Sequence, residues 1–107
     1  SNAMLLPAVT AWSVSGDTAR YAHCARYMEI ADAGDTDAVA CDKLMHGLAA
    51  LTADLQVPGP RQYGIAEQDW FDALPVMAQQ ALDSGSPGNN PRVPQADEIV
   101  ELYRALW

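Results

Sequence analysis

Apolar residues recur three or four positions apart along most of the chain, and no stretch shows the period of two that a half-buried strand requires. The most regular apolar stripe lies in a helix that we expect from Thr36 or Asp37 to Gln56. Its members, at i, i+4, i+7 and i+11, are Leu44, Leu48, Leu51 and Leu55. The following Val-Pro-Gly-Pro run, residues 57–60, ends that helix. We expect the stripe to be a core face.

The same period predicts four more helices, over residues 4–13, 18–33, 67–83 and 96–106. Asp17 is placed to cap the start of the second helix, and Gly34 to end it. The apolar stripe of that helix consists of Tyr21, Cys24, Ala25 and Met28. The last helix places four apolar residues on one face: Ile99, Leu102, Tyr103 and Leu106. The predicted fold is therefore an all-α bundle of five or six short helices joined by loops rich in proline and glycine.

Pro75 interrupts the fourth of these helices. Proline removes a backbone donor and clashes with the preceding turn, so a kink or a break is expected there. The broken form would comprise two helices, over residues 67–73 and 75–83. The residues alone leave both forms open.

The charge excludes some partners. With 107 residues the chain makes one domain or less, and its formal net charge of −8 opposes binding to nucleic acid or to an anionic membrane. No apolar run approaches the roughly 20 residues that span a bilayer, and no secretory signal is visible.

Residues 1–3, Ser-Asn-Ala, look like the remnant of an expression tag, which leaves residues 4–107 as the helical segment. With two cysteines and no disulfide framework, we expect a cytoplasmic location.

Few residues suggest chemistry. A metal site could be assembled from His23, Cys24, Cys41 and His46, but they lack the close ligand spacing typical of zinc, and structural cysteines are favoured. Carboxylate pairs at helix starts are explained by the helix dipole. There is no phosphate-binding glycine loop, nucleophile elbow or H-E-x-x-H motif. We therefore assign no catalytic, cofactor-binding or metal-binding residue from the pattern.

The end of the chain, "NNPRVPQADEIVELYRALW", resembles the C-terminus of iron-containing (group III) alcohol dehydrogenases, the family of lactaldehyde reductase and maleylacetate reductase. The shared features are the Asn90-Pro91-Arg92 turn, a short capped helix and the terminal Trp107. Further segments resemble the family in the same order: "MLLPAV", "RYAHCARYMEIA", "LTADLQVPG" and "LPVMAQQALDSG". Gln95 stands where the family usually has Ser or Thr as an N-cap, at a cost of about 1 kcal/mol.

The resemblance implies an oxidoreductase that interconverts alcohols and aldehydes with NAD(P) and a divalent metal, iron or zinc. In the family an α/β domain binds the nucleotide, and an Asp with three His holds the metal. These parts precede the segment that this chain matches, and neither His23 nor His46 corresponds to a ligand. The chain alone is therefore expected to bind no cofactor and to be inactive. Ser86 aligns with a cysteine near the substrate pocket, so it would border that pocket in a complete enzyme.

A second hypothesis is a stand-alone helical interaction module. A segment without its neighbouring domain should expose apolar helix faces, and such faces drive association. We therefore expect a homo-oligomer, packed through the first helix and its apolar residues Leu5, Leu6, Val9 and Trp12. The metal-binding protein based on the cysteines and histidines is the third hypothesis.

Overall fold

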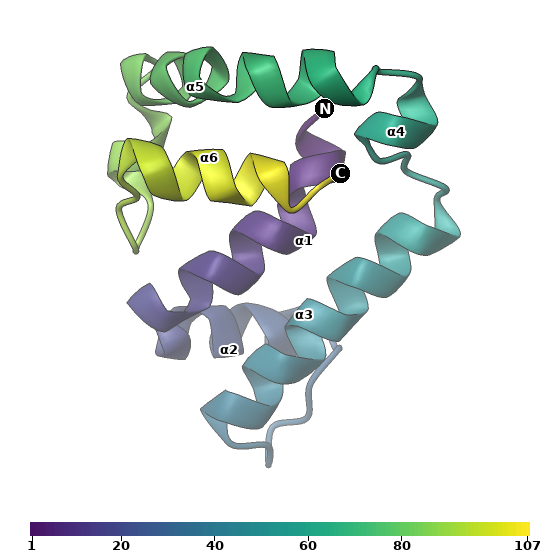
Figure 1. Cartoon of the computed structure of the whole chain (residues 1–107). Coiled ribbons are helices and arrows are strands. Elements are labelled where there is room, and N and C mark those ends of the chain that lie inside the picture. Colours follow the sequence, from purple (N-terminus) through teal and green to yellow (C-terminus); the bar gives the residue numbers. More distant parts are fainter.

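A computed structural model describes all 107 residues, and its regular elements are all helical (Figure 1). The α-helices are α1 (Asn2–Ser13), α2 (Thr18–Tyr27), α3 (Asp37–Asp54), α4 (Pro60–Tyr63), α5 (Glu67–Asp83) and α6 (Ala96–Arg104). Two 3-10 turns, η1 (Val14–Gly16) and η2 (Ser86–Asn89), follow α1 and α5. The predicted all-α class is confirmed, and the number of helices falls within the predicted five or six. The short helix α4 was not predicted.

The helices pack as two pairs, α2 with α3 and α5 with α6, and α1 crosses between the pairs (Figure 1). Small side chains let α2 and α3 approach closely; their shared core contains Ala22, Ala25, Ala40, Cys41, Leu44 and Leu48. The second pair is centred on the buried Trp70 and Leu74 of α5 and Ile99 of α6. The molecule is flat, measuring 46 × 30 × 17 Å, and its radius of gyration of 14.9 Å exceeds the roughly 13 Å of a compact domain this size.

The predicted end of the second helix at Ala33 is wrong, because α2 stops at Tyr27. Glu29 adopts a left-handed φ of 59°, and the Ile30 N–H donates to the Ala25 carbonyl at 3.0 Å. This Schellman geometry turns the chain back, so that Ile30 packs on the first core. Gly34 lies beyond this end. The Asp17 cap is confirmed, since its carboxylate accepts a hydrogen bond from the Arg20 N–H at 3.2 Å.

The stripe of α3 forms a core face over only half of its length. Leu44 and Leu48 are buried, but Leu51 and Leu55 are 47% and 67% exposed. The prediction is wrong for these two leucines, which lie beyond the segment of α3 that packs against α2. The same face of α3 therefore passes from core to an exposed apolar surface.

The two-helix interpretation around Pro75 is also wrong, since α5 continues from Glu67 to Asp83. Pro75 is exposed, and its missing N–H leaves the carbonyl of Phe71, four residues earlier, without a helical hydrogen bond. Trp70, Leu74 and Ala78, at i, i+4 and i+8, are all buried. The buried residues precede and follow Pro75 in the sequence, so their packing keeps the helix continuous across the proline.

The C-terminal residues pack on α4 and α5. Trp107 lies against Phe71, with ring centroids 6.0 Å apart, and the Arg61 guanidinium is 5.6 Å from the indole centroid. At the start of α6, the Gln95 side chain makes no capping bond, as expected for glutamine. The Glu98 carboxylate instead accepts a hydrogen bond from the Gln95 N–H at 2.9 Å. A neighbouring acidic residue thus replaces part of the missing cap.

An ion cluster ties the α2–α3 loop to α3. The Lys43 ammonium lies 2.7 Å from the Asp35 carboxylate, which also accepts a hydrogen bond from the Asp32 N–H at 2.9 Å. The hydrogen bond from Lys43, followed by that from Asp32, lowers the pKa of Asp35. The hydrogen bond to Asp35 raises the pKa of Lys43. These shifts make the stability of the loop depend on pH.

Folding lowers the pKa of Asp35, so its stabilisation is complete above the ordinary value of 3.8 and is lost as the pH falls through the lower folded value. The contribution of Lys43 is complete below 10.5 and is lost as the pH rises through its raised folded value. We expect Asp35→Asn to lower the urea midpoint near pH 7 and to reduce both pH dependences. The exposed Asp54 has no ion-pair partner, so Asp54→Asn is the matched control. Equal pH profiles for the two variants would contradict this assignment.

Candidate functional site

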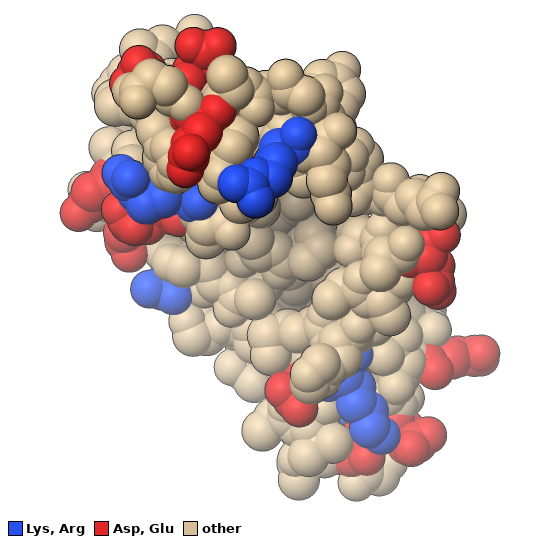
Figure 2. All heavy atoms as spheres, turned by 45° about the vertical axis from the view of Figure 1, so that its right-hand side comes forward, with Lys and Arg blue, Asp and Glu red and all other residues tan.

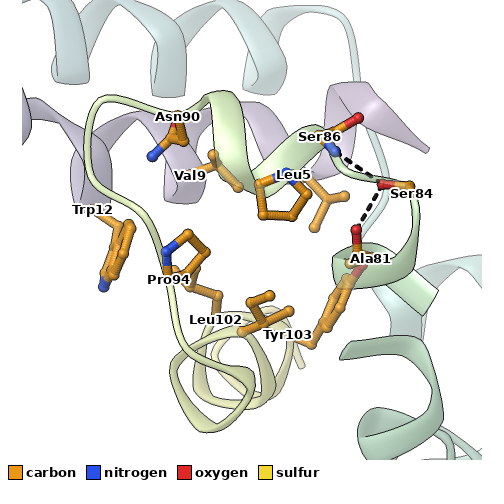
Figure 3. A pocket seen from close by; sticks show the side chains of 12 residues that line it. Leu5, Val9, Trp12, Ala81, Ser84, Ser86, Asn90, Pro94, Leu102 and Tyr103 are labelled. Carbon is orange, nitrogen blue, oxygen red and sulfur yellow. Dashed lines mark hydrogen bonds between the residues drawn. The ribbon is translucent and has the colours of Figure 1, made fainter. Parts of the chain in front are cut away.

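A cavity of about 290 Å³ lies between α1, the end of α5 with η2, and α6 (Figure 3). Its walls are mostly apolar. They include Leu5, Val9 and Trp12 of α1, Pro94 of the loop, and Leu102 and Tyr103 of α6. The amphipathic α6 faces α1 with Leu102, and the indole N–H of Trp70 in α5 donates to the Tyr103 carbonyl at 3.2 Å. Three helices thus position the site.

Ser86, the residue that the sequence assigned to a pocket border, lies in the wall of this cavity at the start of η2. Its backbone N–H donates to the Ser84 hydroxyl at 3.3 Å, and the Ser84 hydroxyl donates to the Ala81 carbonyl at 2.6 Å. Figure 3 shows the Ser86 hydroxyl oxygen directed away from the ring of apolar side chains. Ser86 therefore contributes to the wall, while its hydroxyl lies outside the cavity.

The Asn90-Pro91-Arg92 turn fastens this loop to the end of α1. The Asn90 amide donates to the Ser13 hydroxyl at 2.8 Å, and the Arg92 guanidinium donates to the Trp12 carbonyl at 2.9 Å. The guanidinium also stacks 3.8 Å from the centroid of the Trp12 ring. Ser13 is fully buried, so this bond satisfies a hydroxyl that water cannot reach. The turn thereby fixes the loop wall of the cavity.

Most of the apolar residues of the first helix that we expect at an oligomer interface line the cavity of this chain, and the oligomer itself stays a prediction. Leu5, Val9 and Trp12 face the cavity and α6, and only Leu6 of that set is strongly exposed. The spacing of the apolar residues correctly predicted that Leu5, Val9 and Trp12 lie on one helix. It could not identify α6 as their neighbour, because α6 lies more than 80 positions further along the chain.

The proposed metal ligands do not form a donor cluster. Cys24 is exposed, which corrects its assignment to a buried stripe, and Cys41 is buried with its thiol donating to the Thr18 carbonyl at 3.3 Å. Burial raises the pKa of Cys41, which favours the neutral thiol. Nowhere in the chain do three or more His, Cys, Asp or Glu side chains come together in a way that could hold a metal ion. The residues of this chain therefore do not fit the metal that the family implies.

Charges of both signs are interspersed on the face shown in Figure 2, where Lys and Arg side chains lie beside Asp and Glu. The same face is hollowed between its upper and lower parts. None of the helices is long and apolar enough to cross a membrane.

Comparison with known proteins defines the class of protein. A family model described as "Fe-containing alcohol dehydrogenase family, C-terminal" matches residues 1–107. The chain therefore belongs to the iron-containing alcohol dehydrogenase family, as the resemblance of its end indicated. The match includes residues 1–3, which the sequence suggested as the remnant of an expression tag, and α1 begins at Asn2 within them.

Individual relatives agree with the family. The chain is 32% identical over 108 aligned residues to lactaldehyde reductase of Escherichia coli strain K12 and to 1,3-propanediol dehydrogenase of Citrobacter freundii. It is 28% identical to an NADPH-dependent butanol dehydrogenase of Clostridium saccharobutylicum. In all three cases the alignment covers 100% of this chain and 27% of the relative. The chain thus spans about a quarter of the length of these relatives.

Proposed function

We propose that this chain is the C-terminal helical part of an iron-containing alcohol dehydrogenase-like oxidoreductase that interconverts alcohols and aldehydes with NAD(P). The family match over residues 1–107 carries this proposal. Two of the relatives are named as dehydrogenases of small alcohols and one as a reductase of lactaldehyde. We place the protein in the cytoplasm, where its two free thiols stay reduced.

Within such an enzyme the chain would supply a wall, and its own side chains would carry no chemistry. It lacks a metal donor cluster, and every regular element is a helix, whereas family enzymes bind the nucleotide on an α/β domain. Ser86 and η2 would border the substrate pocket from the side of α5. The isolated chain is therefore catalytically silent.

The exposed surface supports this role as a part of a larger body. The chain exposes 6761 Å², whereas a compact monomer of 11.5 kDa exposes about 5,800 Å². Among the exposed residues are Leu51 and Leu55, which continue a core stripe. Excess surface with an apolar component is typical of a segment that packs against another domain.

A fusion tests the proposal. The segment of E. coli lactaldehyde reductase that aligns with this chain is replaced by residues 1–107, and NAD(P)-dependent alcohol oxidation is measured after loading with iron or zinc. We expect turnover from the fusion and none from the isolated chain under the same conditions. The unaltered reductase and the reductase lacking that segment are the two controls.

Two results would contradict the proposal. Turnover, or stoichiometric tight metal, in the isolated chain would exclude catalytic silence. A folded fusion that binds metal and nucleotide but gives no turnover would exclude the oxidoreductase role.

The second candidate is a helical module that forms a homo-oligomer, and the exposed leucines favour it. Leu6, Leu51 and Leu55 are each more than 45% exposed, so a second copy would cover apolar surface. Light scattering should then give a mass above that of one chain at micromolar concentration. The double variant Leu51→Ser, Leu55→Ser should shift the mass towards the monomer. A stable monomer in the unaltered chain would end this candidate.

A further inference from the structure

The cavity between α1, η2 and α6 shares Ser86 with the proposed border of the substrate pocket, but its lining is mostly apolar and has a binding chemistry of its own. None of its twelve lining residues is charged. The Ser84 hydroxyl is already engaged with Ala81 and Ser86, and the Ser86 hydroxyl is directed outwards (Figure 3). The Asn90 amide and the Tyr103 side chain are further polar groups of the lining, and both are uncharged. A charged ligand would lose water there and meet no group of opposite charge, so the lining favours uncharged molecules.

The cavity is held open from three sides. Arg92 and Asn90 bind the loop wall to Trp12 and Ser13, and Trp70 binds α5 to the backbone of α6. Pro94 is buried in the loop wall, and its ring restricts the backbone there. These fixed walls oppose collapse, and a preformed apolar pocket is the usual form of a small-molecule site.

The volume sets the size of the ligand. An apolar cavity of about 150 Å³ in another protein stays dry and binds benzene. At about 290 Å³, the present cavity has room for one or two rings or a short aliphatic chain. Its aromatic walls, Trp12 and Tyr103, favour flat aromatic ligands.

We propose that this chain binds small uncharged apolar molecules, of the size of benzene or indole, in the cavity between α1, η2 and α6. Binding requires neither metal nor nucleotide, so the inference goes beyond the proposed function. The proposed binding needs only the residues of this chain, so it can be tested on the isolated chain.

The test titrates the purified chain with benzene and indole, and with benzoate and benzylamine as charged compounds of one ring. Binding is followed by the indole N–H signals in nuclear magnetic resonance, assigned with single Trp→Phe variants. Of the three tryptophans only Trp12 lines the cavity, so its signal should shift saturably while those of Trp70 and Trp107 move little. The charged compounds should bind at least about tenfold more weakly, because burial of an unpaired charge is costly.

A pair of identical substitutions localises the site. Val9→Phe places a ring in the cavity, and we expect it to weaken benzene binding at least about tenfold by occupying the volume. Val76→Phe makes the same change on the exposed side of α5, where Val76 is 60% exposed, and should leave binding unchanged. If Val9→Phe fails to fold by circular dichroism, Leu102→Phe blocks the cavity from α6 instead.

The outcomes separate this inference from the proposed function. Absence of a saturable Trp12 shift with benzene and indole overturns it, as does binding of benzoate or benzylamine at equal strength. Unchanged benzene binding by a folded Val9→Phe or Leu102→Phe variant overturns it too. If neither variant folds, the Trp12 shift and the charge series in the unaltered chain decide. The binding measurements contain no metal or nucleotide, so an inactive fusion would contradict the proposed function but not the binding of apolar molecules.

Discussion

Leu74→Ala is expected to lower the free energy of unfolding by about 2–5 kcal/mol, which is the usual range for truncating a buried leucine. Leu74 of α5 is fully buried and lies one turn from both Trp70 and Ala78 of the same helix. The core is small, with 15 of 107 residues buried, so a loss of this size is a large part of the total stability. Urea unfolding followed by circular dichroism measures the change.

Leu55→Ala is the matched control for this prediction. It removes the same atoms from Leu55, which follows the last residue of α3 and is 67% exposed, and its effect should stay within about 0.5 kcal/mol. If the two variants are equally stable, Leu74 does not occupy the core position described.

Gly16→Ala is expected to cost about 1–3 kcal/mol, the range for forcing an extra carbon into a packed site. A Cβ at Gly16 would lie 2.6 Å from the carbonyl carbon and oxygen of Pro91 and 2.7 Å from the Arg92 nitrogen, all backbone atoms. The variant must therefore separate η1 from the Asn-Pro-Arg turn. Urea unfolding gives the cost, and a shift of the Trp12 indole signal reports the loosened Arg92 stacking.

Gly34→Ala provides the comparison, because nothing lies within 4 Å of a Cβ at that position. The alanine restricts the unfolded chain, so we expect a neutral to slightly stabilising effect of up to about 1 kcal/mol. A Gly16→Ala variant as stable as Gly34→Ala would show that η1 and the turn are not in contact.

The sequence predicted helix starts well because their signals are local. Asp17 and Thr36 each accept a hydrogen bond from a backbone N–H three residues ahead, at 3.2 Å in both cases. The end of α2 could not be predicted in the same way. There the chain turns back and Ile30 packs closely on Gly47, where an added Cβ would lie 3.1 Å from an Ile30 methyl group; this contact exists only in the folded chain.

The candidate site was only partly visible in the sequence. Resemblance to the family predicted that Ser86 borders the substrate pocket of a complete enzyme. Ser86 lines the cavity between α1, η2 and α6, and its place beside a substrate stays a prediction. The opposite wall was missed, because periodicity identifies the apolar side of α1 but not the helix that covers it. Likewise, the half-covered stripe of α3 cannot be read from its spacing, since Leu48 and Leu51 look equivalent there.

The arrangement of two helix pairs bridged by α1 has a consequence for how the chain opens. Because the α2–α3 pair and the α5–α6 pair meet mainly through α1, amide hydrogens in the two pairs should exchange with solvent in two separate groups. Each group would have its own opening free energy, and α1 would set how strongly one opening triggers the other. The chain would then behave as two cooperative units coupled by a single helix, so one melting temperature would not describe it.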